Sequence, residues 1–284
     1  SPSRRPSSCL YSSECGGCQW IDIKDAKQVE AKKGFIEESF SRIGSLKEKI
    51  DIKITTSPEI FNYRNRILLR GTLEKDKVKV GFFKTESHDQ IHIKECQIAH
   101  PAHNRLISYL NSIKLKETRK QKFRLEIQVL PEMVKEKRPS LLLTLIPIEK
   151  KHALSELHKV LKAYAETESL SYQNEPLKKE ALLFEKSNSL SYYTQPGIFQ
   201  QINSKANEKL RARVKDIVDS INSKNILDLY CGSGNLSLQL AKEKRTILGV
   251  EVNKKSIEVA KVNVKKNSLL GLSYRSENVR PFLK

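Results

Sequence analysis

One long amphipathic stretch and several short apolar stretches mark the first part of the chain. Between residues 22 and 43 apolar side chains recur at helical spacing, and Gly44 stands where such a helix would end. The apolar positions are Ala26, Val29, Ile36, Phe40 and Ile43. Between residues 50 and 184 the pattern changes to short β-rich stretches, which predict strands at 67–73, 78–83, 90–93, 125–130 and 141–146. We therefore expect an α+β domain in the middle of the chain.

From residue 203 onward, helical and extended patterns alternate. A helix is predicted to begin at Asn203 or Ser204, either of which can cap it, with an apolar face at helical spacing. That face comprises Ala206, Leu210, Val214, Ile217 and Ile221. Strands are predicted at 226–230, 246–252 and 272–275, with helices at 236–242 and 254–267 between them. This alternation indicates parallel βαβ units.

These patterns divide the chain into three predicted parts. Residues 1–45 hold a loop of cysteines and the first helix, and residues 46–190 form the α+β domain. Residues 191–284 form the first portion of an α/β domain. The predicted fold class is therefore α/β plus α+β.

The first parallel strand runs into a glycine-rich turn. Gly232 and Gly234 allow the backbone to approach a ligand, and amides at the following helix start can face an anionic group. Glu251 falls at the end of the second strand, where a carboxylate can accept both hydroxyls of a ribose. A dinucleotide fingerprint requires Gly or Ala where Ser237 stands, and it does not require Asp228. An acidic residue at that point suits an ammonium-bearing ligand such as S-adenosylmethionine.

The odd number of cysteines, in a chain without a secretion signal, disfavours a disulfide framework. Three of them form a C-x5-C-x2-C pattern around two glycines, and a fourth lies farther along the chain. These four are Cys9, Cys15, Cys18 and Cys96. Four thiolates around an iron–sulfur cube are a standard arrangement. A zinc site that includes His100 and His103, or a set of free thiols, are the alternatives.

The charge balance indicates a polyanionic partner. The chain has 52 Lys and Arg residues against 33 Asp and Glu residues, a formal net charge of +19. Two basic stretches connect the predicted strands of the middle domain: Lys114, Lys116, Arg119, Lys120, Lys122 and Arg124, then Lys135, Lys137 and Arg138. Phosphate contacts by such residues release counterions whatever the sequence. Phe123, the one aromatic residue inside the first stretch, is weak support for a base-stacking surface.

Nothing in the sequence predicts a membrane protein. The longest mostly apolar run, residues 140–148, contains Pro147 and is far shorter than the roughly 20 residues that a membrane span needs. The first residues lack the apolar core of a signal peptide. We therefore expect a cytoplasmic protein.

Four separated sequence blocks carry a likeness to a known family. They are the four cysteines; Tyr63-Arg-Asn-Arg66 with Gly81-Phe-Phe and Ser87-His-Asp; Phe199-Gln-Gln-Ile-Asn203; and Asp228-Leu-Tyr-Cys-Gly-Ser-Gly-Asn235 with Gly249-Val-Glu-Val-Asn253. On these blocks the chain resembles the RNA (uracil-5-)methyltransferase family, in particular its iron–sulfur-containing ribosomal RNA branch. The resemblance implies a partial Rossmann-like methyltransferase domain that uses S-adenosyl-L-methionine.

The same resemblance implies roles for individual residues. The four cysteines would hold a [4Fe-4S] cluster with a structural or RNA-docking role. The positions that match residues around S-adenosyl-L-methionine are Gln201, Tyr230, Asn235, Glu251 and Asn278, beside Gly232 and Gly234. Cys231 lies within the cofactor turn and is not expected to be catalytic, because the family's catalytic cysteine belongs to a later motif.

The implied mechanism is nucleophilic. A thiolate adds to C6 of a uracil, C5 attacks the cofactor methyl, and a base removes the C5 proton before elimination. The target base has to be unpaired or flipped out of its stack. The family continues with an Asp-Pro-Pro-Arg-like motif, the nucleophilic Cys and a Glu base, and none of these is found here. We expect the catalytic residues beyond residue 284, and this chain alone to be inactive.

The expected partner is RNA, with 23S ribosomal RNA favoured over transfer RNA because of the cysteine cluster, and the expected state is a monomer. Two other functions remain open at this point. A non-catalytic iron–sulfur RNA-binding protein would account for the charge, the cysteines and the missing active site. An NAD-dependent oxidoreductase would account for the strand, the glycine turn and Glu251 alone.

Overall fold

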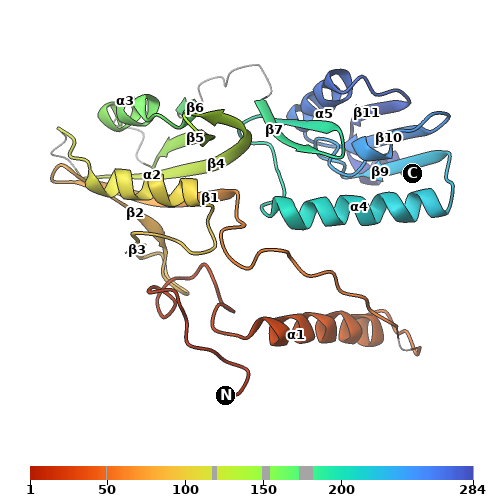
Figure 1. Cartoon of the computed structure of the whole chain (residues 1–284), viewed down its shortest axis with the longest axis horizontal. Helices are drawn as coiled ribbons and strands as arrows, with labels where there is room; N and C mark the ends of the chain where they lie inside the picture. The colour runs from red at the N-terminus through yellow and green to blue at the C-terminus, as the bar shows by residue number, and fades with distance from the viewer. Residues whose placement is uncertain (49, 117–119, 149–153, 173–181, 284) are drawn as a thin grey trace.

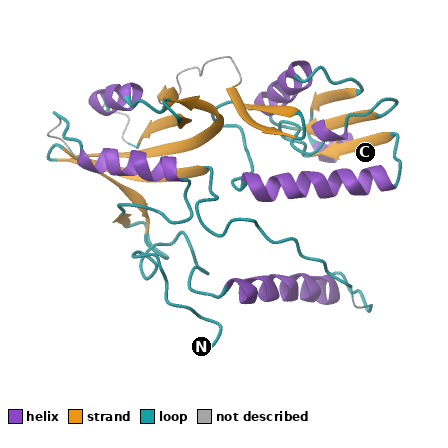
Figure 2. Cartoon of the chain, viewed as in Figure 1, coloured by secondary structure: helices purple, strands orange, loops and turns teal. Residues whose placement is uncertain are grey.

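The structure of the protein is a computed structural model, and it describes residues 1–48, 50–116, 120–148, 154–172 and 182–283. Arg119 of the first basic stretch lies outside these residues. Figure 1 shows a middle part built on a large sheet and a C-terminal part built on a smaller one. Loops make up most of the N-terminal segment apart from one helix, and another long loop leads from that helix to the middle part (Figure 2).

Six strands form the sheet of the middle part. They are β1 (Arg66–Glu74), β2 (Lys77–Phe83), β3 (Gln90–His92), β4 (Gln121–Lys135), β5 (Arg138–Pro147) and β6 (Thr167–Tyr172). Their order is β3-β2-β1-β4-β5-β6, and all neighbours are antiparallel except β5 and β6. The five strands predicted in this region are confirmed, and β4 is longer at both ends than predicted. The sequence reading did not identify β6.

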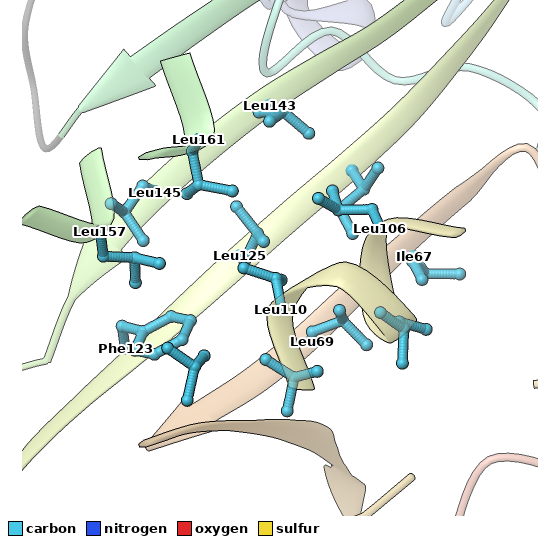
Figure 3. Packing of buried hydrophobic residues seen from close by; sticks show 14 of the residues in the cluster. Ile67, Leu69, Leu106, Leu110, Phe123, Leu125, Leu143, Leu145, Leu157 and Leu161 are labelled. Atoms are coloured by element: carbon cyan, nitrogen blue, oxygen red, sulfur yellow. The ribbon is translucent and has the colours of Figure 1, made fainter. Parts of the chain in front are cut away.

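The main hydrophobic core lies between this sheet and two helices, α2 (Pro101–Ser112) and α3 (Ser155–Ala163). Figure 3 shows leucines of both helices facing the inward side chains of the sheet, such as Leu125. Phe123 is fully buried in the same core. The prediction that Phe123 contributes to a base-stacking surface is therefore wrong, because alternate residues of β4 face the core and Phe123 is one of them.

The predicted N-terminal helix is confirmed as α1 (Asp25–Glu38), which continues as a π-helical turn, η1 (Ser39–Ile43), and ends before Gly44. None of its residues is buried, so its apolar positions do not pack on a core among the described residues. The amide of Gln28 donates to the carbonyls of Trp20 and Ile23 and holds the first turn against the preceding loop.

A hairpin of β7 (Leu182–Ser187) and β8 (Leu190–Thr194) joins the two main parts. Phe184 packs with Leu130 and Leu142 on the six-stranded sheet. On its other side, the backbone amide of Tyr193 donates to the Asn263 side chain of α5 (Lys254–Lys266), and that of Ser191 donates to the side chain of Asn267, which caps this helix. The hairpin therefore fixes the C-terminal part against the middle part.

The C-terminal part holds a parallel sheet of three strands in the order β11-β10-β9. Its elements are α4 (Ser204–Ser220), β9 (Asn225–Leu229), η2 (Leu238–Leu240), β10 (Thr246–Glu251), α5 (Lys254–Lys266), β11 (Leu272–Ser276) and α6 (Val279–Phe282). The predicted parallel strands and the helix over 254–267 are confirmed. The helix predicted over 236–242 is wrong: turns and the short 3-10 helix η2 stand there instead.

Helix α4 is capped as predicted, since the Asn203 side chain accepts a hydrogen bond from the amide of Ala206. The predicted inward face is wrong, however. Its buried residues are Asn207 and Arg211, whereas Leu210, Ile217 and Ile221 are exposed. Polar contacts with the hairpin and the glycine turn, described below, decide which face points inward. Among the described residues, no helix combines the length and apolar character that crossing a membrane requires.

Candidate functional site

The glycine turn follows β9 directly, and every second residue from 230 to 234 has a left-handed backbone conformation. Tyr230, Gly232 and Gly234 all have positive φ, at 58°, 55° and 87°. A Cβ added to Gly232 would meet no atom within 4 Å. A Cβ on Gly234 would lie 2.6 Å from the hydroxyl of Tyr274 on β11. The turn therefore presents Gly232 to open space and packs Gly234 against the sheet.

Helix α4 holds this turn through its polar face. The side-chain amides of Asn207 and Asn235 donate to each other's oxygens at 2.8 and 2.9 Å. The Arg211 guanidinium donates to the same Asn235 oxygen at 3.3 Å, forms an ion pair with Glu185 of the hairpin and lies over the Tyr192 ring. The predicted cofactor residue Asn235 thus has its side chain occupied by α4, which makes it a residue that fixes the shape of the turn.

The loop before α4 also reaches the turn. Gln200 is buried, and its amide donates to the hydroxyls of Thr194 and Ser233 at 3.2 Å each. The Asn263 amide, from α5, donates to the carbonyl of Ser233 at 3.1 Å. The neighbouring Gln201 accepts from the Asn65 amide through its backbone carbonyl. Sequence reasoning gave no role to Gln200, although it lies in the block of residues 199–203. It did not identify Asn263, which belongs to no motif.

Two carboxylates flank the turn. Glu251 stands at the end of β10, where it was predicted, and its carboxylate accepts a hydrogen bond from the Asn253 backbone amide at 2.9 Å. Asp228 on β9 is mostly buried, and burial raises the pKa of its carboxyl despite a hydrogen bond from Ser237. Its Oδ2 is buried and has no hydrogen-bond partner among the described residues. This oxygen is available to a cationic group of a ligand.

Cys231 is buried beneath the turn, and it does not have the properties of a nucleophile. Burial, together with the nearby carboxylates of Asp228 and Glu251, raises the pKa of its thiol to about 12. The thiol is therefore protonated at neutral pH, and the thiolate is the reactive form. That Cys231 is not catalytic stays a prediction.

Tyr230 and Asn278 occupy the outer rim of the same sheet end. The Tyr230 side chain is 68% exposed. Asn278 follows β11 and caps α6, its side chain accepting from the Arg280 amide at 3.0 Å. Both residues follow the carboxyl ends of parallel strands, where ligands of such sheets bind.

A second candidate site lies in the N-terminal half of the chain. The four predicted ligands, Cys9, Cys15, Cys18 and Cys96, line one cavity together with Tyr11 and Arg64. In the described ranges no three His, Cys, Asp or Glu side chains are placed to hold one metal ion. His100, the candidate for a mixed zinc site, lines a different cavity and caps α2.

Backbone contacts hold the cysteine loop on the edge of the six-stranded sheet. The Gly16 amide donates to the carbonyl of Phe83 at 3.0 Å, and the Lys94 amide donates to the hydroxyl of Tyr11 at 2.9 Å. Ser8 and Gln97 exchange two further hydrogen bonds. The cysteine loop therefore forms hydrogen bonds with residues on both sides of Cys96 in the sequence, Lys94 and Gln97.

Burial and the closeness of the other cysteines raise the pKa of two thiols in this cavity. Burial, followed by Cys96, Cys15 and Cys9, raises the pKa of Cys18 to about 11. Burial also raises the pKa of Cys96, although the backbone amides of Ala99 and Ile98 donate toward its sulfur. Arg64 lowers the pKa of Cys18, and its Nε is buried without a hydrogen-bond partner in the described part of the chain. A bound anionic group would use that donor.

A comparison with known protein families assigns the chain to one of them. A family model described as tRNA (Uracil-5-)-methyltransferase matches residues 24–275. The chain belongs to this family. Membership removes the support for an NAD-dependent oxidoreductase, which rested on the turn and Glu251 alone.

Individual relatives match almost the whole chain. It is 27% identical over 288 residues to the 23S rRNA (uracil(1939)-C(5))-methyltransferase RlmD of Idiomarina loihiensis, covering 98% of this chain and 63% of that protein. It is 25% identical over 282 residues to an uncharacterized RNA methyltransferase of Thermosynechococcus vestitus, covering 92% and 62%. The chain therefore spans less than two thirds of the length of these relatives.

A solved structure supports the fold. The tRNA (uracil-54, C5)-methyltransferase of Pyrococcus abyssi, in complex with S-adenosyl-L-homocysteine, matches with a TM-score of 0.69 at 22% identity. The match covers 97% of this chain and 66% of that one. The predicted mixed α/β methyltransferase fold is thus confirmed.

Proposed function

We propose that the protein transfers a methyl group from S-adenosyl-L-methionine to C5 of a uracil in structured RNA. The observation that carries this proposal is the glycine turn, found in a chain that belongs to a uracil-5-methyltransferase family. Gly232 faces open space, and the partnerless Oδ2 of Asp228 lies buried on the strand that leads to it. An open backbone beside a free carboxylate oxygen fits a nucleoside that carries an amino-acid group.

S-adenosyl-L-methionine supplies an electrophilic methyl group when it is bound. In our proposal Glu251 accepts the ribose hydroxyls, Asp228 accepts the ammonium group, and Gly232 lets the backbone approach. Tyr230, Gln201 and Asn278 line the rim, whereas Asn235 and Gly234 shape the turn. Holding the cofactor in one orientation lowers the entropic part of the barrier to methyl transfer.

We propose no residue of this chain as the nucleophile or as the proton-accepting base. In support, Cys231 is buried with a raised thiol pKa, and the other four cysteines line the cavity described above. On this view the chain supplies cofactor binding and RNA binding. The non-catalytic alternative predicts that no such nucleophile exists in the parent protein.

We favour 23S ribosomal RNA over transfer RNA as the substrate. In support, a relative that matches 98% of this chain is named for 23S rRNA, and the cavity gathers all four predicted cluster ligands. The test is methylation by the protein expressed from its complete gene, with both RNAs offered in turn, and detection of 5-methyluridine by mass spectrometry. Product in 23S rRNA alone is expected. Product in transfer RNA alone would overturn the substrate proposal, and product in neither would overturn the function.

We further propose that the cysteine cavity holds a [4Fe-4S] cluster bound by Cys9, Cys15, Cys18 and Cys96. The donor set fits, because four thiolates ligate such clusters and the Arg64 guanidinium offsets their negative charge. The raised thiol pKa values mean that binding releases protons, so assembly should become more favourable as the pH rises. When bound, the cluster supplies a rigid anionic cross-link between the loop and the sheet.

Metal analysis after anaerobic purification tests the cluster. Iron and acid-labile sulfide are expected at about four per chain, and Cys96→Ala should lose most of both. Cys231→Ala is the matched control, because it removes a buried thiol outside the cavity and should keep the iron. One zinc per chain, or equal iron in both variants, would contradict the proposal.

A further inference from the structure

One face of the six-stranded sheet carries no helix in the described part of the chain. Helices α2 and α3 both pack on the opposite face, where the core lies. Side chains alternate between the two faces along each strand. We call the helix-free surface of β1, β2, β3 and β4 the open face. It is formed by Leu68, Arg70, Lys79, Phe83, His92, Lys122 and Arg124.

The open face places positive charges directly against each other. Arg70 pairs with Arg124 across β1 and β4, and Lys79 and Lys122 both flank Thr72 in the next row. No carboxylate lies within ion-pair distance of any of these four cations among the described residues. The acidic side chains that share this face of β1 and β4, Glu74 and Glu126, form ion pairs with Lys120 and Arg66 instead.

Like charges directly opposite each other destabilise a sheet. The sheet keeps these four cations together without a counter-charge of its own from the described residues. A bound polyanion would convert this repulsion into attraction and would release counterions. The pairing in register, rather than the number of basic residues, distinguishes the open face from an ordinary solvated surface.

The open face also carries a flat side-chain surface on which an RNA base can stack. The Arg70 guanidinium lies over the Phe83 ring, 4.5 Å from its centroid. The His88 and Phe83 rings form a T-shaped pair with their centroids 5.6 Å apart. The Phe83 side chain is partly exposed. Unpaired bases stack on aromatic rings and on guanidinium planes, whereas duplex RNA keeps its bases stacked internally. The arrangement thus favours single-stranded RNA.

Strand β1 leads from this surface toward the cofactor turn. At its start, Arg66 donates to the carbonyl of Ile198 at 3.1 Å. That carbonyl belongs to the loop in which Gln200 contacts Ser233 of the turn. Four residues of a strand span about 13 Å, so Arg70 lies about that far from this junction along β1.

We propose that the open face binds a single-stranded RNA segment next to the target uracil, with one base on the Arg70–Phe83 pair and phosphates on Lys79, Lys122 and Arg124. This proposal rests on the proposed function, because the segment it binds is defined by the uracil that is methylated. It adds a defined surface to the RNA contact that the charge balance alone indicates.

Binding of a fluorescent single-stranded RNA, followed by anisotropy at several salt concentrations, tests the stacking contact first. Phe83→Leu keeps an apolar side chain but removes the ring, and should weaken binding about 5- to 150-fold without changing the salt dependence. Phe40→Leu is the matched control, an exposed aromatic on η1 that should bind as the unmodified protein does. Equal binding by both variants would overturn the stacking contact.

The phosphate contacts are tested by charge removal. The double variant Lys79→Gln and Lys122→Gln should make the salt dependence of log K shallower by about 1.4, since each phosphate contact contributes about 0.7 for single strands. The control double variant, Lys261→Gln and Lys265→Gln on α5, removes the same charge from exposed positions elsewhere. Equal losses in both double variants would mean a non-specific charge effect and would overturn the proposed surface.

Methyl transfer separates the two proposals. If the open-face variants bind and methylate RNA as the unmodified protein does, the surface is wrong while the function stands. If the variants lose RNA binding but the unmodified protein yields no 5-methyluridine, the function is wrong while the surface stands. A duplex competitor that displaces the single strand at equal concentration would also contradict the proposed surface.

Discussion

The two glycines of the glycine turn, the proposed cofactor site, allow a sharp test, because alanine should affect them through different physical causes. At Gly232 the added methyl group meets open space, so only the left-handed backbone conformation lowers the free energy of unfolding. That cost is about 1–2 kcal/mol, and the stiffer unfolded chain offsets about 0.4–1 kcal/mol of it. We therefore expect Gly232→Ala to lower the free energy of unfolding by about 1 kcal/mol.

At Gly234 the same substitution adds a steric term. The new Cβ would lie 2.6 Å from the Tyr274 hydroxyl and 3.2 Å from Leu238 Cγ, so both side chains would have to move. Overpacking of this kind costs about 1–3 kcal/mol beyond the backbone strain. Gly234→Ala should therefore lower the free energy of unfolding by about 2–4 kcal/mol in urea titrations.

Gly232→Ala, which should cost less stability than Gly234→Ala, should nevertheless weaken cofactor binding directly. Calorimetric titration with S-adenosyl-L-homocysteine should show at least about tenfold weaker binding by Gly232→Ala, about 1.4 kcal/mol, although that variant remains folded. Gly197→Ala is the control, because Gly197 also has positive φ and open space but lies outside the turn. Full binding by a folded Gly232→Ala variant would refute the placement of the cofactor at this turn. Equal stability of the Gly232 and Gly234 variants would refute the steric argument.

Three further predictions concern stability. Phe123→Ala removes a fully buried ring and should lower the free energy of unfolding by about 3–5 kcal/mol; a loss under about 1 kcal/mol would contradict its place in the core. Burial lowers the pKa of His103 to about 3, so the unfolded chain binds a proton that the folded protein excludes. Stability should fall as the pH drops from about 6.5 toward 3, and His103→Leu should make this fall shallower; an unchanged slope would refute it. Asn207→Ala breaks both hydrogen bonds to Asn235 and should cost about 1–3 kcal/mol by thermal unfolding, with weaker S-adenosyl-L-homocysteine binding; unchanged stability and binding would show that α4 does not hold the turn.

The strands could be predicted because alternation is a local property. Residues such as Leu69 and Leu125 are buried while their neighbours are not, and the sequence records this directly. Helix α4 shows the limit of the method. Its apolar stripe predicts one buried face, but the Arg211 ion pair with Glu185 and the Asn207 contact with Asn235 turn the polar face inward. Those partners lie on other elements, so no local pattern reveals them.

The candidate sites likewise contain residues that short motifs identify and residues whose role depends on the fold. Gly232 and Glu251 belong to short motifs at strand ends, and the four cysteines are a spaced set, so residue type and spacing were enough to propose them. The supports of the turn, Gln200 and Asn263, are single amides that become meaningful only when the chain folds. Asn235 was assigned to the cofactor by resemblance, and its hydrogen bonds to α4 now give it a supporting role.

The cysteine cavity joins parts of the chain that are far apart in sequence. Any group bound by both Cys18 and Cys96 closes a loop of about 80 residues, and by the chain-entropy model such a closure removes about 4–5 kcal/mol of freedom from the unfolded chain. That is comparable with the whole stability of many domains. The loop it closes includes α1, which buries no residue of its own. Loss of the bound group would therefore shift the folding equilibrium of the entire first third of the chain, well beyond the cavity itself.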